Sequence, residues 1–489
     1  MINLVKNELT KVFRKKGIYI LLIIALAFVV LYNFIGRFAP NNMYSYYHDD
    51  YRYSEENKNY INNALRNIDP ENSRDTYEYA SLMTELEIID LVNKYGISSW
   101  QTRIIEMDLY SIIYEMYEAK YVLADEEAYL TYKTDLEEKI DLLDADDWQS
   151  FAIKMNDEAK VYYEEMKTLY ETNSNKNNIK NLEDELKRAA LSYEIAKMRL
   201  EYNIRFGDDF LNRELQNYEM YKSELIYYDG NEDVTHEEKY SITTSQKNAA
   251  IAKYAIENGV DVNNMGDSRG MVLNIFSEYS WIILIIVVMI SGSIVSDEFS
   301  KGTIKLLLVK PYNRSKILAS KFIVSMLMLP ISLIVILLMQ TVIGGLFFGF
   351  SSFNIPAVIY SFSSGSIQTM SIFSYIFLEA LAYMPQILLL MTLAFAFSTI
   401  FTNTAVSVVL PIMGTIASEI INALVIGYNV KIMRFFVTLN WDFTDYMFGG
   451  INRFQYVNLP LSIIVCIVYF LIMVITTFIV FKNKDIKND

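Results

Sequence analysis

Six stretches of this chain are apolar for about 20 residues each, the length that a helix needs to cross a bilayer. No other feature limits the fold as strongly, because only helices and closed barrels satisfy their backbone hydrogen bonds within lipid. The sequence therefore predicts an all-α membrane protein with six transmembrane helices. The expected spans are residues 18–35, 272–295, 322–348, 375–400, 405–426 and 459–481.

A long acidic insert, residues 36–271, separates the first two spans. It contains 26 Lys and Arg against 48 Asp and Glu, whereas the rest of the chain carries a net positive charge and the whole chain −15. No proline occurs between Pro70 and Pro311, and helix-forming residues dominate this stretch. Long helices are expected where helix breakers are absent. The insert is thus predicted to be a large α-helical domain.

Two stripes of apolar residues in the insert have helical spacing. One runs from 148 to 169 and the other from 179 to 204, and a polar run joins them. This pattern predicts an antiparallel, coiled-coil-like hairpin, with Asp146 or Asp147 capping the first helix. A third helix is expected over 104–143.

The orientation follows from the basic residues, which cytoplasmic loops collect. They precede the first span, separate the second from the third and follow the sixth, whereas the loop 349–374 has none. Both termini are therefore expected in the cytoplasm and the insert outside. The loop 428–458 is then external as well, although Lys431, Arg434 and Arg453 weaken the bias there. We expect the first span to be retained rather than cleaved as a signal peptide.

Several function classes are excluded by count. The chain has one cysteine, Cys466, and two histidines, so neither a disulfide framework nor a zinc site is expected. It has no Walker motif for ATP, and no catalytic constellation can be assembled. The negative charge of the insert disfavours binding to nucleic acid, because it would repel the phosphates. The segment 229–233 lacks the glycine and glutamate of a calcium loop. No catalytic residue, metal ligand or bound cofactor is expected.

The first 17 residues form an expected amphipathic helix at the cytoplasmic surface. Val5, Leu9, Val12 and Phe13 fall on one stripe, and most of the lysines and arginines lie off it. Such a helix suits the boundary between lipid and water, where its cations meet anionic headgroups. An ordinary basic lead-in to the first span is the alternative.

The loop 296–321 carries a recognisable pattern. An acidic residue precedes Gly-Thr, an apolar turn follows, and then come Pro, Arg-Ser and a later Lys. The positions are Glu298, Gly302, Thr303, Leu306, Leu307, Pro311, Arg314, Ser315 and Lys321. This loop resembles the first cytoplasmic loop of ABC-2-type transporter permeases. The basic amphipathic start, the six-span layout and Asn403-Thr-Ala-Val before the fifth span are similar to that family too. The resemblance covers the membrane frame, roughly half of the chain, and the long insert departs from the minimal plan.

The resemblance implies a permease subunit of a bacterial ABC exporter in the plasma membrane. Two permease chains, identical or paralogous, would pair, and each would contact a separate ATPase subunit that holds ATP and Mg. The chain itself would then not be an enzyme. Residues 302–309 would form a coupling helix against the ATPase. The coupling residues would be Glu298, Gly302, Thr303, Ile304, Leu307, Leu308, Pro311 and Arg314.

Polar residues within the expected spans offer a candidate substrate path. The residues that would line it are Glu379, Gln386, Glu419 and Asn422. Gln340 is a further polar residue within an expected span. A carboxyl group in a span is costly and usually faces protein or water. Hydrogen bonding between helices is the structural alternative.

The resulting hypothesis is ATP-driven export of an amphipathic substrate, such as an antimicrobial peptide, an antibiotic or a lipid-like molecule. Sodium or drug efflux is an alternative within transport. A membrane receptor or immunity protein, whose external helices bind a ligand without transport, is an alternative of another class. The coupling loop distinguishes them, because a receptor has no need of it.

Overall fold

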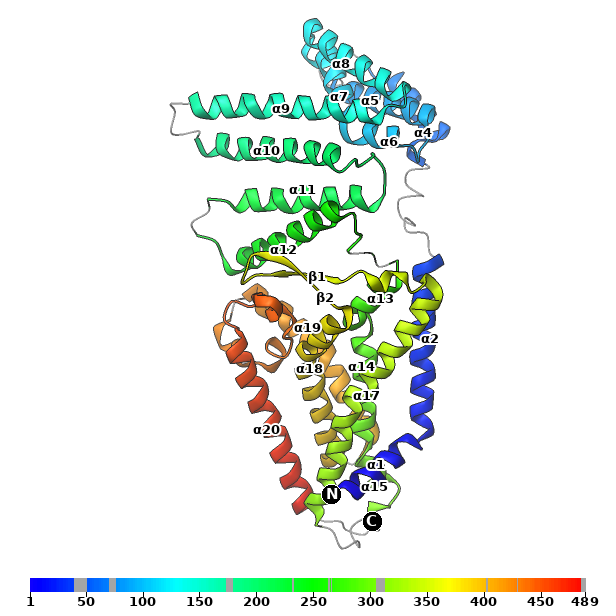
Figure 1. Cartoon of the computed structure of the whole chain (residues 1–489), viewed down its shortest axis with the longest axis vertical. Helices are drawn as coiled ribbons and strands as arrows, with labels where there is room; N and C mark the ends of the chain where they lie inside the picture. The colour runs from blue at the N-terminus through cyan, green and yellow to red at the C-terminus, as the bar shows by residue number, and fades with distance from the viewer. Residues whose placement is uncertain are drawn as a thin grey trace. The chain divides into compact units, whose positions relative to one another are not determined.

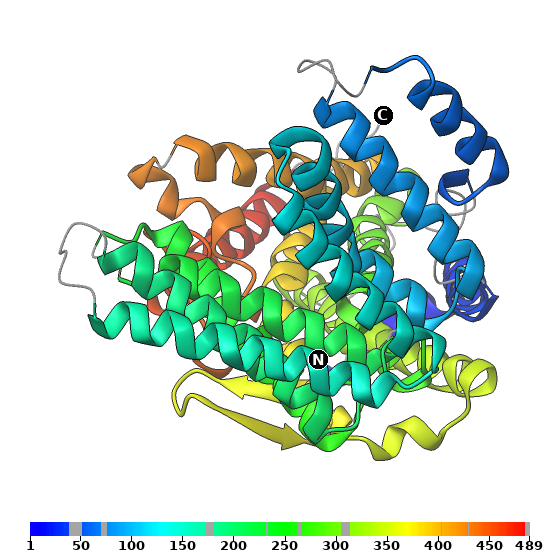
Figure 2. The ribbon, with the colours of Figure 1, turned by 90° about the horizontal axis from the view of Figure 1, so that it is seen from above.

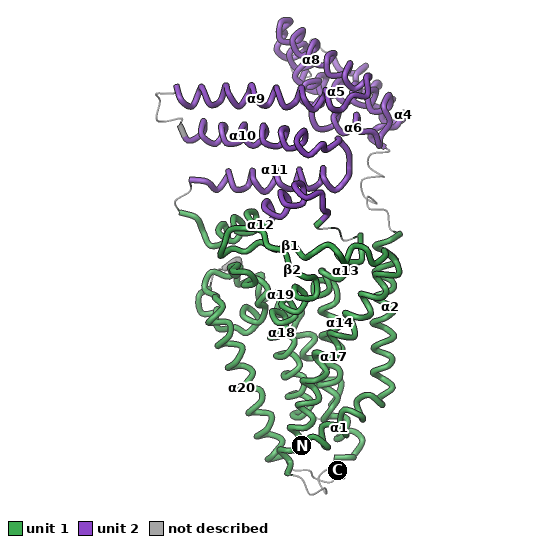
Figure 3. The backbone as a smooth tube through the Cα atoms, in the orientation of Figure 1, with its two compact units in different colours: residues 1–38, 232–247, 262–489 green, residues 39–231, 248–261 purple. Residues whose placement is uncertain are grey.

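A computed structural model describes most of the chain (Figure 1). The described residues are 1–38, 51–69, 76–172, 179–230, 233–262, 264, 266–304, 313–401, 403–428 and 430–484. Most of them are helical, and there is almost no sheet among them. Two compact units are distinguished in Figure 3, and each is described by itself. The first unit comprises residues 1–38, 232–247 and 262–489, and the second comprises 39–231 and 248–261.

The first unit contains six helices that are long and apolar enough to cross a membrane, as the sequence predicts. Most helices match or extend beyond the expected apolar stretches, by up to eight residues at the start of α17, whereas α14 is shorter than expected at both ends. They are α2 (Lys16–Phe38), α14 (Ile275–Ser293), α17 (Arg314–Phe348), α18 (Ile372–Ile400), α19 (Thr404–Tyr428) and α20 (Leu459–Asn483).

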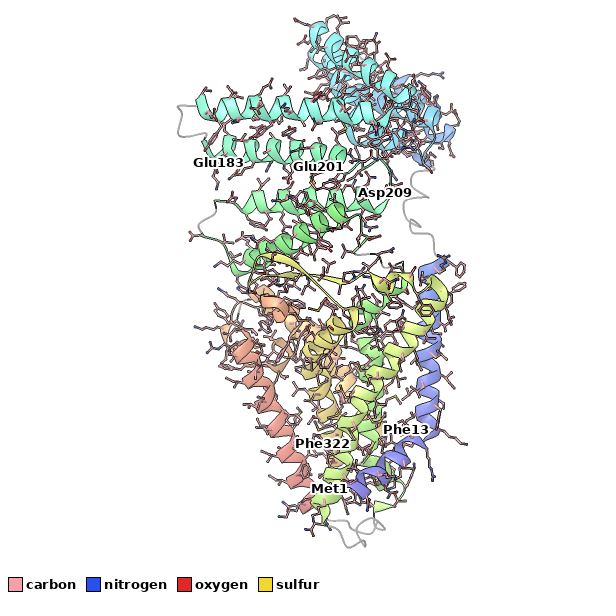
Figure 4. All side chains as sticks on the ribbon, in the orientation of Figure 1. Met1, Phe13, Glu183, Glu201, Asp209 and Phe322 are labelled. Carbon is pink, nitrogen blue, oxygen red and sulfur yellow. The ribbon has the colours of Figure 1, made fainter. Side chains whose placement is uncertain are left out.

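The spans differ in how much of them this chain buries. In the apolar windows of α14 and α18, 61% and 56% of the residues are buried, against 11% in α19 and 17% in α20. The main core lies between α14, α17 and α18, with α2 beside it. Phe322 of α17, labelled in Figure 4, packs its ring 5.2 Å from that of Phe395 in α18. The frame is thus organised around α14 and α18.

Short elements connect the spans of this unit. The helices are α1 (Ile2–Phe13), α13 (Ser268–Leu273) and α15 (Ser296–Ser300), and the 3₁₀ turns are Ser351–Asn354, Lys431–Phe435, Val437–Leu439 and Thr444–Gly449. The sequence did not predict the two-stranded sheet β1 (Ala357–Ser361) and β2 (Ser366–Met370), the yellow arrows of Figure 2. Alternating burial in β1 accompanies this hairpin, and Gly365 at φ +62° fits its turn.

The second unit is helical, as expected. Its helices are α4 (Glu55–Leu65), α5 (Thr76–Tyr95), α6 (Trp100–Ile104), α7 (Tyr110–Glu118), α8 (Glu126–Asp144), α9 (Trp148–Thr172), α10 (Ile179–Glu201) and α11 (Phe210–Tyr228), and α12 (His236–Asn258) begins in the first unit. The predicted hairpin is present, since α9 packs along α10 (Figure 1). Asp147 caps α9, accepting a hydrogen bond from the Ser150 backbone N–H at 3.0 Å.

The expected single helix over 104–143 is wrong. The chain forms α6, a π-turn at Ile105–Leu109, α7, a second π-turn at Ala119–Leu123 and then α8. Ala124 has φ +51° and ends the first part, and Asp125 caps α8 by accepting from the Ala128 N–H at 3.0 Å. A new helix therefore begins at a capping aspartate, although the apolar pattern of the sequence continues through this point.

Residues 262–271 pack with the membrane frame, although the sequence assigns them to the insert. Arg269 is fully buried and donates hydrogen bonds to the backbone oxygens of Val262 (2.9 Å) and Pro356 (2.9 Å). Ser268 donates to the Gly349 carbonyl at 2.6 Å. These bonds fix α13 to the segment that follows α17.

Candidate functional site

Four charged side chains meet where α1, α15 and α17 converge. The Lys321 ammonium lies 2.7 Å from a Glu8 oxygen and 3.3 Å from a Glu298 oxygen, and it also donates to the Ile294 carbonyl at 3.1 Å. Lys11 completes the group at 3.0 Å from Glu8 and 3.1 Å from Glu298. We call Glu8, Lys11, Glu298 and Lys321 the junction cluster. Its two carboxylates and two ammonium groups balance in charge.

The amphipathic start of the chain builds one side of this cluster. Val12 is 2% exposed, and Val5 and Leu9 pack against the frame core, as their common stripe suggests. Phe13, labelled in Figure 4, is 39% exposed and does not share that packing. Glu8 lies on the buried face at 4% exposure because Lys321 neutralises it. Thus α1 packs on α17 through both apolar and ionic contacts.

Two cations of this region, Lys11 and Lys15, are paired with protein carboxylates. Lys15 lies 2.7 Å from Asp297, and Lys11 belongs to the junction cluster. The sequence assigned these cations to anionic lipid, since periodicity shows which face a residue occupies but not its partner. Lys11, on α1, and Lys15, shortly after it, attach this part of the chain to the segment after α14, and the expected contact with lipid stays a prediction.

The pKa of Glu298 is lowered by its neighbours in the junction cluster. Burial by itself raises its pKa, but the charge of Lys321 and hydrogen bonds from Thr303 and Lys11 outweigh burial and lower the pKa to about 2. The Glu298 side chain is 14% exposed, so solvent screens these interactions little. Glu298 is therefore a carboxylate held in its charged form.

Hydrogen bonds fix the same segment to α18 and α19. The Ser398 hydroxyl accepts from the backbone N–H groups of Val295 (3.2 Å) and Ser296 (2.9 Å). Thr404 donates to Asp297 at 3.1 Å. The segment 294–298, which follows α14, thus contacts α1, α17, α18 and α19 through polar groups.

The predicted coupling residues fall into three groups: those close to Glu298, those outside the described residues, and Arg314. Thr303 donates a hydrogen bond to the Glu298 carboxylate, Gly302 has φ +68°, and Ile304 is 2% exposed. Leu307, Leu308 and Pro311, with most of the expected helix 302–309, lie outside the described residues.

Arg314 stabilises helix ends rather than joining the junction cluster. It donates to the carbonyls of Lys484 (2.9 Å) and Lys482 (3.3 Å) at the end of α20. Lys484 in turn donates to the carbonyls of Thr399 (2.8 Å) and Ile400 (2.9 Å) at the end of α18. These are helix C-terminal carbonyls that lack partners within their own helices.

The four candidate path residues differ in burial. Glu379 and Asn422 are half-buried, and each has one shielded oxygen without a hydrogen-bond partner in the described part of the chain. Gln386 is half-buried on α18, and Glu419 is exposed on α19. Asp442 and Lys247 interact electrostatically with Glu379. The functional and structural readings of these residues both stay predictions.

A buried polar group between α2, α14 and α17 was recognised only in part. Gln340, noted in the sequence, exchanges hydrogen bonds with Asn33 at 2.9 and 3.1 Å. Tyr279 donates to the Gln340 side-chain oxygen at 2.7 Å. Asn33 lies near the end of an apolar run, which was the available signal. This network satisfies its members internally, as polar groups within spans usually require.

The ion pairs of the junction cluster join α1, α15 and α17. Among the residues that the structure describes, no group of three or more His, Cys, Asp or Glu is placed to hold a metal ion. Paired charges at this spacing cross-link helices, and they offer no free nucleophile. The cluster is best described as a mechanical junction.

Comparison with known proteins supports membrane character. A family model described as "Protein of unknown function (DUF2705)" matches residues 239–487. The chain is 27% identical over 205 residues to the "Uncharacterized protein YhcI" of Bacillus subtilis, covering 41% of this chain and 64% of that relative. It is 24% identical over 237 residues to the "Uncharacterized membrane protein YdbK" of the same organism, covering 48% and 89%.

The alignment thus spans less than two thirds of the length of YhcI. No solved structure matches the chain. Together with the six apolar helices, the similarity to a membrane protein identifies this chain as a membrane protein.

Proposed function

This chain belongs to the DUF2705 family, and we propose that it is the permease subunit of an ATP-driven ABC-2-type exporter. In this proposal a separate ATPase subunit binds ATP and Mg, and a second permease chain, identical or paralogous, completes the complex. The substrate is amphipathic, with an antimicrobial peptide as the leading class. Both termini lie in the cytoplasm and the second unit lies outside the cell.

The observation that carries the proposal is the junction cluster. Glu298 and Thr303 belong to the loop that resembles the family's coupling loop, and Lys321 joins Glu298 to α17 while Lys11 joins it to α1. A permease must convert a displacement of that loop into movement of its spans. A network of buried ion pairs transmits such a displacement because its parts cannot separate without leaving charges unpaired.

The exposed carboxylate of Glu419 supports a second chain or an aqueous path. Glu419 lies on α19, whose neighbours Ile416 and Ile420 are 56% and 61% exposed. A carboxylate that faces lipid at this depth is costly, whereas protein or water would accommodate it. Glu419→Gln is expected to impair transport while the complex still assembles, and unchanged transport would contradict a role in the path.

The decisive experiment is purification of the chain from its native membrane in mild detergent, followed by mass spectrometry of the proteins that accompany it. We expect an ATPase with a Walker motif, at a ratio that also reports whether one or two kinds of permease chain are present. Changing Leu307 and Leu308 to Asp should abolish its recovery, because charge on the apolar face of a docking helix prevents burial.

A matched control uses Met107→Asp with Leu123→Asp, which places two charges on exposed apolar residues of the second unit. That variant should keep the ATPase. If no ATPase accompanies the unmodified chain under conditions that preserve other ABC complexes, the exporter proposal fails. A receptor or immunity protein then becomes the better hypothesis.

A further inference from the structure

A cavity of about 360 Å³ lies in the first unit, bordered by the end of α19 and the segment that leads to α20. Arg434 and Arg453 line it, together with His236 at the start of α12 and Tyr456. We call it the arginine cavity. It is separate from the junction cluster, and no step of the proposed export mechanism uses it.

Two arginines supply the positive charge of the cavity lining, and Arg453 also interacts electrostatically with Asp445, which is not part of the lining. Neither Arg434 nor Arg453 forms an ion pair within the part of the chain that the structure describes. Glu237 is the acidic residue of the lining, so the two guanidinium groups exceed it in charge. Arginine presents a planar fork of N–H donors that matches phosphate oxygens in pairs.

The remaining wall is apolar, and the backbone around it is held in place. Val425, Leu439 and Val457 supply aliphatic surface. The ring N–H at Nε2 of His236 donates to the Asn452 carbonyl at 2.8 Å, since a carbonyl can only accept, and this bond fixes the residue before Arg453. The Arg434 guanidinium lies 4.7 Å from the centre of the Phe435 ring. The cavity therefore combines positioned cations with an apolar wall.

The level of the cavity matches that of lipid headgroups. It lies where the span α19 ends and shortly before α20 begins, which is the boundary between hydrocarbon and water. The adjoining turn exposes Ile432 (73%), Phe435 (48%) and Phe436 (42%). Exposed aromatic and aliphatic side chains beside cations are typical of segments in the membrane interface.

The position of these cations also needs an explanation. Lys431, Arg434 and Arg453 occupy a loop that the charge bias of the chain places opposite the basic termini. They are therefore not accounted for by membrane orientation. A ligand with negative charge at the headgroup level would account for them.

We propose that the arginine cavity binds the phosphate group of an anionic membrane lipid, with Arg434 and Arg453 contacting the phosphate oxygens and the aliphatic wall covering the adjoining glycerol. This inference goes beyond the proposed export function and does not depend on it, because lipid binding is measured on the chain alone. Free phosphate offers the same oxygens but leaves the apolar wall unused, so the experiment separates the two sources.

The test measures binding to the delipidated full-length chain in mild detergent by native mass spectrometry. The probes are dioctanoyl phosphatidylglycerol, dioctanoylglycerol, which lacks the phosphate, and inorganic phosphate. We expect the phospholipid to bind, dioctanoylglycerol to bind at least about tenfold more weakly, and millimolar phosphate not to displace the lipid. Each arginine replaced by Gln should weaken phospholipid binding about tenfold, which corresponds to about 1.4 kcal/mol of charge-assisted hydrogen bonding.

Arg37→Gln is the matched control, because Arg37 is an exposed arginine in the last turn of the span α2 and does not line the cavity. It should bind phospholipid as the unmodified chain does. Equal binding by Arg434→Gln with Arg453→Gln, or equal binding of dioctanoylglycerol, would overturn the proposal. Displacement by inorganic phosphate would show a free-phosphate site instead. Should the double variant fold poorly, Arg453→Gln alone decides, since Arg453 is exposed.

Discussion

Two charged regions of the membrane frame use their charges in opposite ways. In the junction cluster each lysine lies within 3.3 Å of two carboxylates, and Lys321 and Glu8 are almost completely buried. In the arginine cavity the two guanidinium groups have no ion-pair partner among the described residues, and they border open space. A cluster that satisfies its own charges is built to hold helices together. A cavity whose cations have no ion-pair partner can receive an anion, as we propose for this one.

Substitutions in the two regions should therefore have different effects on stability. Removing one member of a buried, paired cluster leaves an uncompensated charge inside the protein, which is strongly destabilising. Removing a charge that has no ion-pair partner leaves no opposite charge buried without its counter-ion, so it costs mainly what the side chain packs against. Substitutions in the junction cluster should therefore lower stability, whereas substitutions in the arginine cavity should weaken binding with little change in stability.

Lys321→Met, in the junction cluster, is expected to have the largest effect on stability. The change leaves Glu8 and Glu298 close together without the more buried of their two cations, and a loss of about 3–5 kcal/mol in the free energy of unfolding is expected. Lys316→Met, an exposed lysine on the same helix, is the control and should change little. Denaturation in detergent measures both. Similar losses in the two variants would mean that the cluster is not a stabilising junction.

The acid sensitivity of Glu298 gives the next largest effect. Its folded pKa of about 2 lies below the ordinary value of 4.5. A lowered folded pKa contributes stability above the ordinary value, and that contribution is lost as the pH falls from about 4.5 through about 2. The difference corresponds to about 3 kcal/mol.

The melting temperature of the unmodified chain should therefore fall more steeply between pH 5 and pH 2 than that of Glu298→Gln. Glu78→Gln, at an exposed carboxylate of the second unit, should keep the steep dependence. Parallel pH profiles for the unmodified chain and Glu298→Gln would show that other carboxylates dominate acid sensitivity.

Gly292→Ala tests the packing of helices next to the junction cluster without changing any charge. A Cβ at Gly292 would lie 2.8 Å from a Val408 methyl group and 3.0 Å from the Ser407 carbonyl oxygen. Overpacking of this kind costs about 1–3 kcal/mol. Gly414→Ala on α19 meets no atom within 4 Å and should be neutral or slightly stabilising. Equal melting temperatures for the two variants would argue against a close approach of α14 and α19.

Arg453→Gln should have the smallest effect on folding. Arg453 is exposed and its side chain has no ion pair in the described residues, so the melting temperature should change hardly at all, as for most surface substitutions. The same variant is expected to weaken phospholipid binding about tenfold. A large fall in melting temperature would give this arginine a structural role and remove the contrast between the two regions.

Apolar length and periodicity predicted most of the fold. All six spans are helices, and the hairpin of α9 and α10 follows its two apolar stripes. These features are local, so each is visible within one stretch of sequence. The break at Ala124 and the strands β1 and β2 were missed, because a single backbone conformation and a short hairpin leave weak signals beside long helical patterns.

The candidate site was predictable only on one side. Glu298 and Thr303 were selected from the loop pattern, but the partners Glu8 and Lys11 are 290 and 287 residues away from Glu298. No periodicity connects positions so distant. Glu8 was overlooked because a single acidic residue in a basic amphipathic helix reads as exposed. Its burial depends on Lys321, which becomes its neighbour only when α17 packs against α1.

The position of Lys484 sets an order on biosynthesis. This residue follows all six spans in the chain, yet its ammonium caps the carbonyls that end the fourth span, α18. Arg314, made much earlier, must likewise wait for the carbonyls of Lys482 and Lys484. Since translation proceeds from the N-terminus, α17 and α18 enter the membrane before these ends can be closed. The frame is therefore fastened only after its last helix has been made.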